Sequence, residues 1–432
     1  MRPACQCICP PAWLECTTWP FQPSDRAKRF GGRSRHRPDC YNRAMRLTRR
    51  HLLAATAELV GVSALSSAWP GIAVAQSSGG VAPGKERLIV RSLRPPDYET
   101  PVALLDAWIT PVESFYVRSH LPAPATVDPT RWTLKVEAGA APVALSLDDI
   151  RRLPSKTLTA TLECAGNGRA FFDPPVAGVQ WGKGAVGTAR WTGARMGDVL
   201  KRAGLRSSGR FVVMDGSDLP LGTMPDFVRQ LPIEKAMHPD TLIAYEMNGA
   251  PVPPMHGFPL RAVVPGWEGA YWMKWLSSLR VVDREHDGFW VSTAYRYPVR
   301  RVAPGAAVDA KDMAPLTGLT VKSLITLPLD ASKQPAGRID VGGFAWAGEH
   351  DITGVEVSTD QGATWAPARL TGDRAAYTWR RFAYSFTATK PESCLIMTRA
   401  RDSSGRVQPI TPHWNPSGYL WNAPDSVRIE VA

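Results

Sequence analysis

Short runs of alternating apolar and polar residues, separated by turns, dominate the chain between about residues 101 and 300. Alternation with a period of two predicts half-buried strands, and the clearest runs are residues 132–138, 157–163, 209–216 and 260–266. Two other stretches have apolar residues three or four positions apart, which predicts helices at residues 146–153 and 193–204. The mixture predicts an α+β region with many turns.

Helical spacing stops at about residue 315, and short strand-like runs follow one another at regular intervals. Turn-forming residues separate them, including Asp360-Gln361-Gly362 and Ser403-Ser404-Gly405. This spacing predicts an all-β, immunoglobulin-like sandwich. The expected strands lie within residues 319–328, 337–346, 354–365, 377–387 and 393–406.

The pattern divides the chain into three parts: residues 1–76, a first domain at 90–305 and a second domain at 315–432, with a linker near 300–315. Residues 45–76 have a basic start, an apolar stretch and a small-x-small site at Ala73–Ala75, which is typical of an export signal. The pair Arg49-Arg50 favours the twin-arginine pathway over an ordinary secretory signal or a membrane anchor. We therefore expect translation to start at Met45, after an upstream extension, and the mature protein to be periplasmic. No later stretch approaches the length of a membrane span.

The net charge of +12 invites a nucleic-acid interpretation, but the charge is unevenly distributed. Residues 1–76 hold eleven Lys/Arg against four Asp/Glu, which is more than half of the surplus. The remaining residues contain no dense basic stripe that would follow a phosphate backbone, so we expect no nucleic-acid partner.

The cysteines are distributed just as unevenly. Five of the seven lie in the first forty residues, which leaves Cys164 and Cys394 in the expected mature protein. Cys164 ends an alternating run and is followed by a turn rich in glycine and by Arg169. Taken alone, it is compatible with a small buried residue, a thiol nucleophile or a thiolate metal ligand.

Three arginines lie in apolar, Gly- or Pro-containing sequence: Arg118, Arg169 and Arg261. A buried guanidinium needs an anion or an acid to compensate it, and few carboxylates are near these three in the sequence. A structural ion pair could account for any one of these arginines, whereas the presence of three in such settings favours an anionic ligand. No HExxH, Walker A, GxGxxG or GxSxG motif supports a zinc hydrolase, a nucleotide-binding site or a serine hydrolase.

Several motifs in a fixed order resemble the sulfite oxidase family of molybdopterin-dependent oxidoreductases. The resemblance extends from about residue 90 to 432, and its C-terminal part, with residues 343–365 and 414–422, is similar to the dimerisation domain of that family. The motifs of the first domain are "FYVRSHLP", "LECAGNGR", "VQWGKGAVGTARWTGARMGDVL", "IAYEMNGAPVPPMHGFPLRAVVPG", "YWMKWL" and "FWVSTAYRYP".

The resemblance implies a role for individual residues and a Mo-molybdopterin cofactor. Cys164 would ligate the molybdenum, while Arg118, Arg169, Trp181 and Tyr295 would form the substrate pocket. The remaining matched positions would bind the cofactor together with Arg118 and Cys164: Tyr116, His120, Asp218, His256, Arg261 and Lys274.

The implied reaction is oxidation of sulfite to sulfate, with electrons leaving one at a time to a separate cytochrome c. The implied assembly is a homodimer or a heterodimer with a cytochrome subunit. One departure is that His350 stands at the apparent match of an arginine that completes the sulfite pocket in the family, and histidine is charged only at lower pH. Two alternatives therefore stay open: a sulfane-sulfur dehydrogenase subunit of the same family, and a cofactor-free periplasmic binding protein.

Overall fold

The computed structural model describes residues 80–124, 127–220 and 222–432 of the chain. Residues Ser77–Ala432 fall in one compact unit. The upstream extension, the start at Met45 and the export signal lie outside the described residues and stay predictions. No helix in the described part of the chain is long and apolar enough to cross a membrane.

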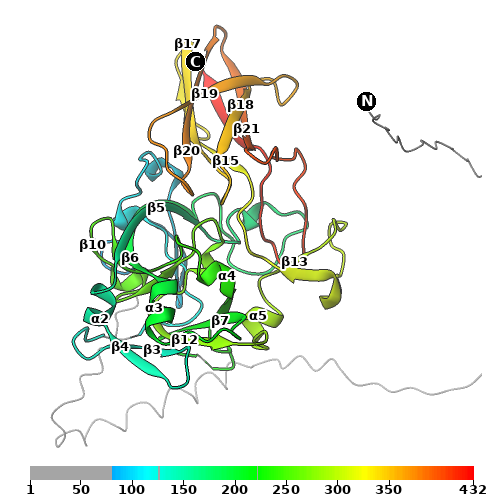
Figure 1. Ribbon diagram of the computed structural model, residues 1–432. Helices are drawn as coiled ribbons and strands as arrows, with labels where there is room; N and C mark the ends of the chain where they lie inside the picture. Colours follow the sequence, from blue (N-terminus) through cyan, green and yellow to red (C-terminus); the bar gives the residue numbers. More distant parts are fainter. Residues whose placement is uncertain (1–79, 125–126, 221) are drawn as a thin grey trace, which may run out of the picture. The chain divides into compact units, whose positions relative to one another are not determined.

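Strands dominate the compact unit, and the first region contains two five-stranded sheets (Figure 1). One sheet runs in the order β10 (Ala250–Pro251), β9 (Leu242–Met247), β6 (Val186–Arg195) and β5 (Ser155–Glu163), and β11 (Arg261–Val263) also pairs with β9. The other sheet runs in the order β4 (Val143–Ser146), β3 (Thr133–Glu137), β12 (Leu276–Val282), β7 (Phe211–Gly216) and β8 (Val228–Pro232). The four strand runs expected from alternation correspond to β3, β5, β7 and β11.

The helices are short. Both predicted helices form, as α2 (Leu147–Arg151) and α3 (Met196–Arg202). Ser146 starts α2 with a capping box, because its hydroxyl accepts the Asp149 N–H while the Asp149 carboxylate accepts the Ser146 N–H. Single turns make up the rest: α4 (Ile233–Ala236), α5 (Phe289–Ser292), and the 3₁₀ turns η1 (Val102–Leu104), η2 (Val112–Ser114), η3 (Arg169–Phe171), η4 (Pro254–His256), η5 (Gly269–Tyr271) and η6 (Ala310–Asp312). The described chain is therefore mostly β.

The second region is an eight-stranded sheet, drawn in yellow to red at one end of the compact unit (Figure 1). Its order is β15 (Lys322–Leu327), β17 (Gly337–Trp346), β20 (Arg380–Ala388), β19 (Ala366–Thr371), β18 (Ile352–Ser358), β21 (Glu392–Asp402), β22 (Asp425–Val431) and β16 (Lys333–Gln334). Two hairpins complete the fold, β1 (Ile89–Leu93) with β2 (Pro96–Glu99) and β13 (Arg296–Pro298) with β14 (Met313–Pro315). The expected linker at residues 300–315 thus includes one strand of a hairpin.

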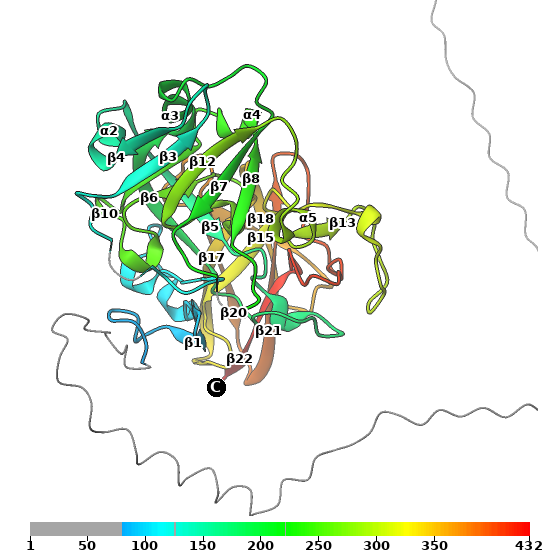
Figure 2. The same cartoon turned by 90° about the horizontal axis from the view of Figure 1, so that it is seen from below.

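Strand β5 brings the glycine-rich turn of residues 164–169 into the interior. The first half of the strand is exposed or half-buried, whereas its last four residues are all buried. Strand β6 lies beside β5 (Figure 2) and pairs with all nine residues of β5, which fixes the course of that strand. The chain therefore enters the turn that begins at Cys164 deep in the main hydrophobic core, to which Cys164 itself belongs.

Candidate active site

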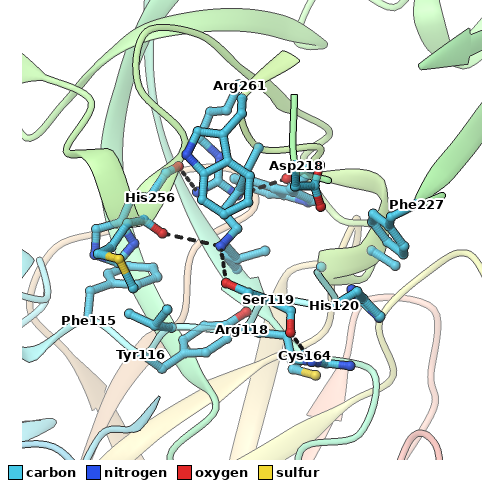
Figure 3. Close-up of a pocket in the computed structure, with 18 of the residues that line it drawn as sticks. Phe115, Tyr116, Arg118, Ser119, His120, Cys164, Asp218, Phe227, His256 and Arg261 are labelled. Atoms are coloured by element: carbon cyan, nitrogen blue, oxygen red, sulfur yellow. Dashed lines mark hydrogen bonds between the residues drawn. The ribbon is translucent and has the colours of Figure 1, made fainter. Parts of the chain in front are cut away.

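A pocket opens beside Cys164 (Figure 3). Its walls come from strands β5 and β11, from the 3₁₀ turns η4 and η5, and from the loops beside other elements. Figure 3 shows Cys164 and Arg118 at one end, and Arg261 and Asp218 at the other. We call this space the inner pocket. The predicted residues that line it are Tyr116, Arg118, His120, Cys164, Asp218, His256, Arg261, Lys274 and Tyr295.

Cys164 has a free thiol that is only 8% exposed. Its backbone N–H donates to the Ala185 carbonyl at 2.9 Å, which ties the start of the turn to the residue before strand β6. Burial raises the pKa of the Cys164 thiol, and the positive charges of Arg118 and Arg169 act in the opposite direction. The Cys164 side chain is therefore a buried thiol, and its loss of a proton is opposed by burial and assisted by two neighbouring cations.

Cations dominate the far end of the inner pocket. The Arg261 guanidinium is 3% exposed and donates to the carbonyls of His256 and Trp272, but its Nε finds no partner among the described residues. Lys274 donates to the Ser119 hydroxyl at 2.7 Å, and burial lowers the pKa of Lys274 to about 7. Burial raises the pKa of Asp218 to about 6. This end is suited to an anionic group, because buried cations with few carboxylates need a compensating negative charge.

Sequence reasoning missed Lys85, which lies behind the inner pocket. Its ammonium is 4% exposed and lies 2.9 Å from His256 Nε2. An ammonium can only donate, so Nε2 accepts and the proton of the neutral imidazole sits on Nδ1. Burial and the charge of Lys85 lower the pKa of His256 well below its usual value, which agrees with a neutral ring.

A second pocket, which we call the outer pocket, shares Arg118, His120, Cys164 and Tyr295 with the inner one. It adds Arg169, whose guanidinium donates to the Val179 and Ser417 carbonyls and lies 5.2 Å from the Tyr419 ring centroid. No carboxylate is among the described residues that line this pocket. Cys164 therefore lies where a cation-rich inner pocket meets a cation-rich outer one.

Three glycines pack closely around the Arg169 guanidinium. An added Cβ at Gly166, Gly178 or Gly418 would approach its guanidinium atoms to 2.7–2.8 Å, closer than real contacts allow. Arg169 is itself 8% exposed, and its Nε makes no hydrogen bond within the described part of the chain. The guanidinium is thus held in one orientation while part of its donor capacity remains unused.

Tyr295 and His120 form a hydrogen-bonded pair, with the hydroxyl 2.5 Å from His120 Nε2. Tyr295 adopts a left-handed backbone conformation with φ of 52°, an uncommon one for a tyrosine, and its ring stacks on Tyr419. Burial raises the pKa of Tyr295 well above its usual value, while burial and Arg118 lower the pKa of His120 well below its own. The pair therefore offers a protonated phenol beside a neutral imidazole.

The structure brings ten of the eleven predicted site residues to the two pockets. Trp181 is the exception, because it lines neither: it is fully buried and its ring meets the Tyr116 ring edge-on at 6.3 Å. His350 is an exposed residue between β17 and β18 and also lines neither pocket. The second region instead contributes Ser417 and Tyr419 to the outer pocket.

Two family models match the chain. The oxidoreductase molybdopterin binding domain matches residues 120–290, and the Mo-co oxidoreductase dimerisation domain matches residues 314–432. The first range includes Cys164, Arg169, Arg261 and Lys274 of the two pockets, and the second includes the eight-stranded sheet.

The chain is also similar to individual curated proteins. It is 38% identical to mitochondrial sulfite oxidase of Rattus norvegicus over 365 residues, which cover 80% of this chain and 66% of that protein. It is 37% identical to sulfite oxidase of Gallus gallus over 361 residues, which cover 80% of this chain and 78% of that protein. The chain therefore spans just under two thirds of the length of the rat protein.

One solved structure agrees over most of the fold. The sulfane dehydrogenase SoxCD from Paracoccus pantotrophus superimposes with a TM-score of 0.69 at 25% identity, covering 86% of this chain and 95% of that chain.

Proposed function

Because the chain belongs to the sulfite oxidase family of molybdopterin-dependent oxidoreductases, we propose that it oxidises a sulfur anion, with sulfite to sulfate as the leading reaction. The observation that carries the proposal is the position of Cys164 between two pockets rich in cations. In the balanced reaction, sulfite and water give sulfate, two protons and two electrons. The cofactor-free binding protein is not proposed, since the family is defined by its cofactor domain.

The described residues fit the Mo-molybdopterin cofactor of the family. Cys164 offers a soft sulfur ligand, and the buried, partly unpaired Arg261 lies at the far end, where an anionic phosphate would compensate its charge. When bound, the cofactor supplies the two-electron oxidation and the oxygen atom that the product gains. The residues proposed to hold it are Tyr116, Arg118, His120, Cys164, Asp218, His256, Arg261 and Lys274.

In the outer pocket, the chain's own groups would bind and orient the anion. Arg169 would bind the anion through its buried positive charge, and Arg118, although paired with Asp97 at 3.1 Å, adds a second positive charge to the same pocket. The Tyr295 hydroxyl, whose raised pKa keeps it protonated, would donate a hydrogen bond either to the neutral His120 ring or to the substrate. Trp181 would act from outside the pocket by supporting the ring of Tyr116.

A sulfane-sulfur substrate is the second candidate. Two observations support it: the likeness to the sulfane dehydrogenase SoxCD, and the neutral Ser417 and Tyr419 as the second region's contribution to the outer pocket. A pocket without a further cation from that side favours a compact dianion less strongly than one that has it.

We further propose a separate cytochrome c as the electron acceptor, a periplasmic location and assembly as a homodimer or a heterodimer with a cytochrome subunit. Support for the assembly comes from the match to a dimerisation domain at residues 314–432. The regular strand spacing supports an immunoglobulin-like class for that region, and the strand and helix mixture supports α+β for residues 90–305.

Steady-state assays with sulfite, thiosulfate and a sulfoxide, each with ferricyanide or cytochrome c as acceptor, test the proposal. We expect sulfite to give the highest kcat/KM. A protein that is fully loaded with molybdenum and oxidises thiosulfate alone would replace the leading substrate by the second candidate. Activity with neither sulfur anion would reject both.

Cofactor retention should depend on pH through Lys274. The Lys274 ammonium must be charged to bind an anion, and the pKa of about 7 means that the cofactor-free site loses this charge as the pH rises. Binding then takes up a proton, so affinity should fall as the pH rises above about 7, by up to about tenfold per pH unit. Molybdenum retained after prolonged dialysis at pH 6.5 and pH 9 measures this.

Lys274→Arg is the matched variant, because a guanidinium keeps its charge over this pH range. It should retain molybdenum equally at both pH values. Equal retention by the unmodified protein at pH 6.5 and pH 9 would show that Lys274 does not bind the anionic part of the cofactor.

A further inference from the structure

The turn that carries Cys164 and Arg169 is held from outside the first region. Glu163, the residue before Cys164, is 3% exposed, and its carboxylate accepts hydrogen bonds from three side chains. One carboxylate oxygen accepts from Lys322 at 2.7 Å and from Asn167 at 2.9 Å, and the other accepts from the Trp346 indole at 2.8 Å. Lys322 and Trp346 belong to β15 and β17 of the second region, so this region reaches the base of the turn.

Lys322 donates hydrogen bonds to residues on both sides of Cys164, Glu163 before it and Asn167 after it. Its ammonium is nearly buried and also donates to the Asn167 carbonyl at 3.0 Å. Asn167 in turn accepts the Ala185 N–H at 3.0 Å, next to the bond between Cys164 and Ala185. A single cation therefore joins the residue before Cys164 to the residue two positions before Arg169.

A second line of contact comes from residues 417–421 of the second region. The Ser417 carbonyl accepts from the Arg169 guanidinium at 3.3 Å, and the Leu420 N–H donates to the Ala165 carbonyl at 3.0 Å. The Trp421 side chain lies so close to Gly168 that an added Cβ there would approach it to 2.7 Å. The turn of residues 164–169 therefore contacts the second region at two places. Lys322 binds Glu163 and Asn167, and residues 417–421 contact Ala165, Gly168 and Arg169.

We propose that Lys322 is a positioning residue of the active site, through which the second region sets the positions of the Cys164 sulfur and the Arg169 guanidinium. Lys322 touches neither pocket, so it acts through Glu163 and Asn167. The contacts of Lys322 with Glu163 and Asn167 do not depend on which reaction the protein catalyses, whereas the kinetic test of this proposal rests on the proposed function.

The test uses the holoenzyme and the double variant Glu163→Gln/Lys322→Met. This variant removes both charges, so no buried charge is left unpaired, and the amide oxygen introduced by Glu163→Gln can still accept from the Trp346 indole. Displacement of Arg169 should raise KM for sulfite about tenfold, and a shift of Cys164 should lower kcat. Hydrogen exchange of the backbone amides at residues 162–169, measured by mass spectrometry, should become faster, since the turn loses a restraint.

Two control variants separate positioning from general stability. Lys183→Met breaks another ion pair between the two regions, with Asp425 at 2.7 Å, and should leave KM, kcat and exchange of residues 162–169 within about twofold. Lys322→Arg keeps the positive charge and the donors. Because Lys322 lines a neighbouring pocket that can take the larger guanidinium, this variant should restore KM.

Unchanged kinetics and unchanged exchange in the double variant would overturn the proposal, as would equal changes in the double variant and Lys183→Met. If the unmodified, molybdenum-loaded protein oxidises no sulfur anion, the proposed function fails instead. The exchange measurement then still decides the role of Lys322, since it needs no turnover.

Discussion

Replacing Cys164 with serine is expected to lower the rate of sulfite oxidation by about 1,000-fold or more, which corresponds to a barrier increase of about 4 kcal/mol. The sulfur lies at the junction of the two pockets, so the change acts on the reacting centre itself. A serine hydroxyl is a harder ligand than a thiolate, and its much higher pKa leaves it protonated in a buried site. Steady-state kinetics per bound molybdenum measure the effect.

The second buried cysteine of the described chain offers a matched control. Cys394 lies in β21 within the hydrophobic core of the second region, and its sulfur lies 3.8 Å from the Thr359 carbonyl. Cys394→Ser should keep kcat within about twofold, because the residue contacts neither pocket. Full activity of Cys164→Ser, or an equal loss in Cys394→Ser, would reject Cys164 as the metal ligand.

Replacing Arg169 with methionine is expected to lower kcat/KM for sulfite roughly 100-fold, mainly through a higher KM. Removal of one buried charge from a charged contact typically costs about 2–5 kcal/mol, and no other cation of the outer pocket occupies the same position. Arg169→Lys should restore little, because one ammonium cannot reproduce the forked contacts with the Val179 and Ser417 carbonyls. Initial rates over a range of sulfite concentrations separate KM from kcat.

Arg190→Met controls for the loss of one positive charge. Arg190 is exposed on β6, away from the pockets, and its replacement should change kcat/KM by less than about twofold. A wild-type KM in Arg169→Met would show that the anion binds elsewhere.

Much of the fold was predictable because the buried faces repeat with regular periods. The spacing of apolar residues after Ser146 marked α2, and alternation marked β5 and β17 from the sequence alone. Strand β22 was missed, although its residues alternate between buried and half-exposed or exposed positions, because the apolar residues that precede it in a loop obscure the pattern. The order in which the strands pair could not be predicted from the sequence, because β12 pairs with β3 and β7, which lie far from it along the chain.

The site was predictable to the extent that its residues lie in distinctive local motifs. Arg118, Cys164 and Arg169 stood out by residue type and setting, and the structure places all three around one pocket. His350, the apparent match of the family's arginine, is exposed between β17 and β18 and lines neither pocket, which the sequence did not indicate. Ser417 carries no chemical signature that would single it out, and Lys322 acts only through contacts made across the fold.

The most direct test of the account is the molybdenum content of the purified, folded protein measured together with its sulfite-dependent reduction of ferricyanide. We expect about one molybdenum atom per chain and a rate that rises in proportion to the molybdenum content. A folded, molybdenum-loaded protein that leaves sulfite and thiosulfate unchanged would contradict it, and so would folded protein that binds no molybdenum.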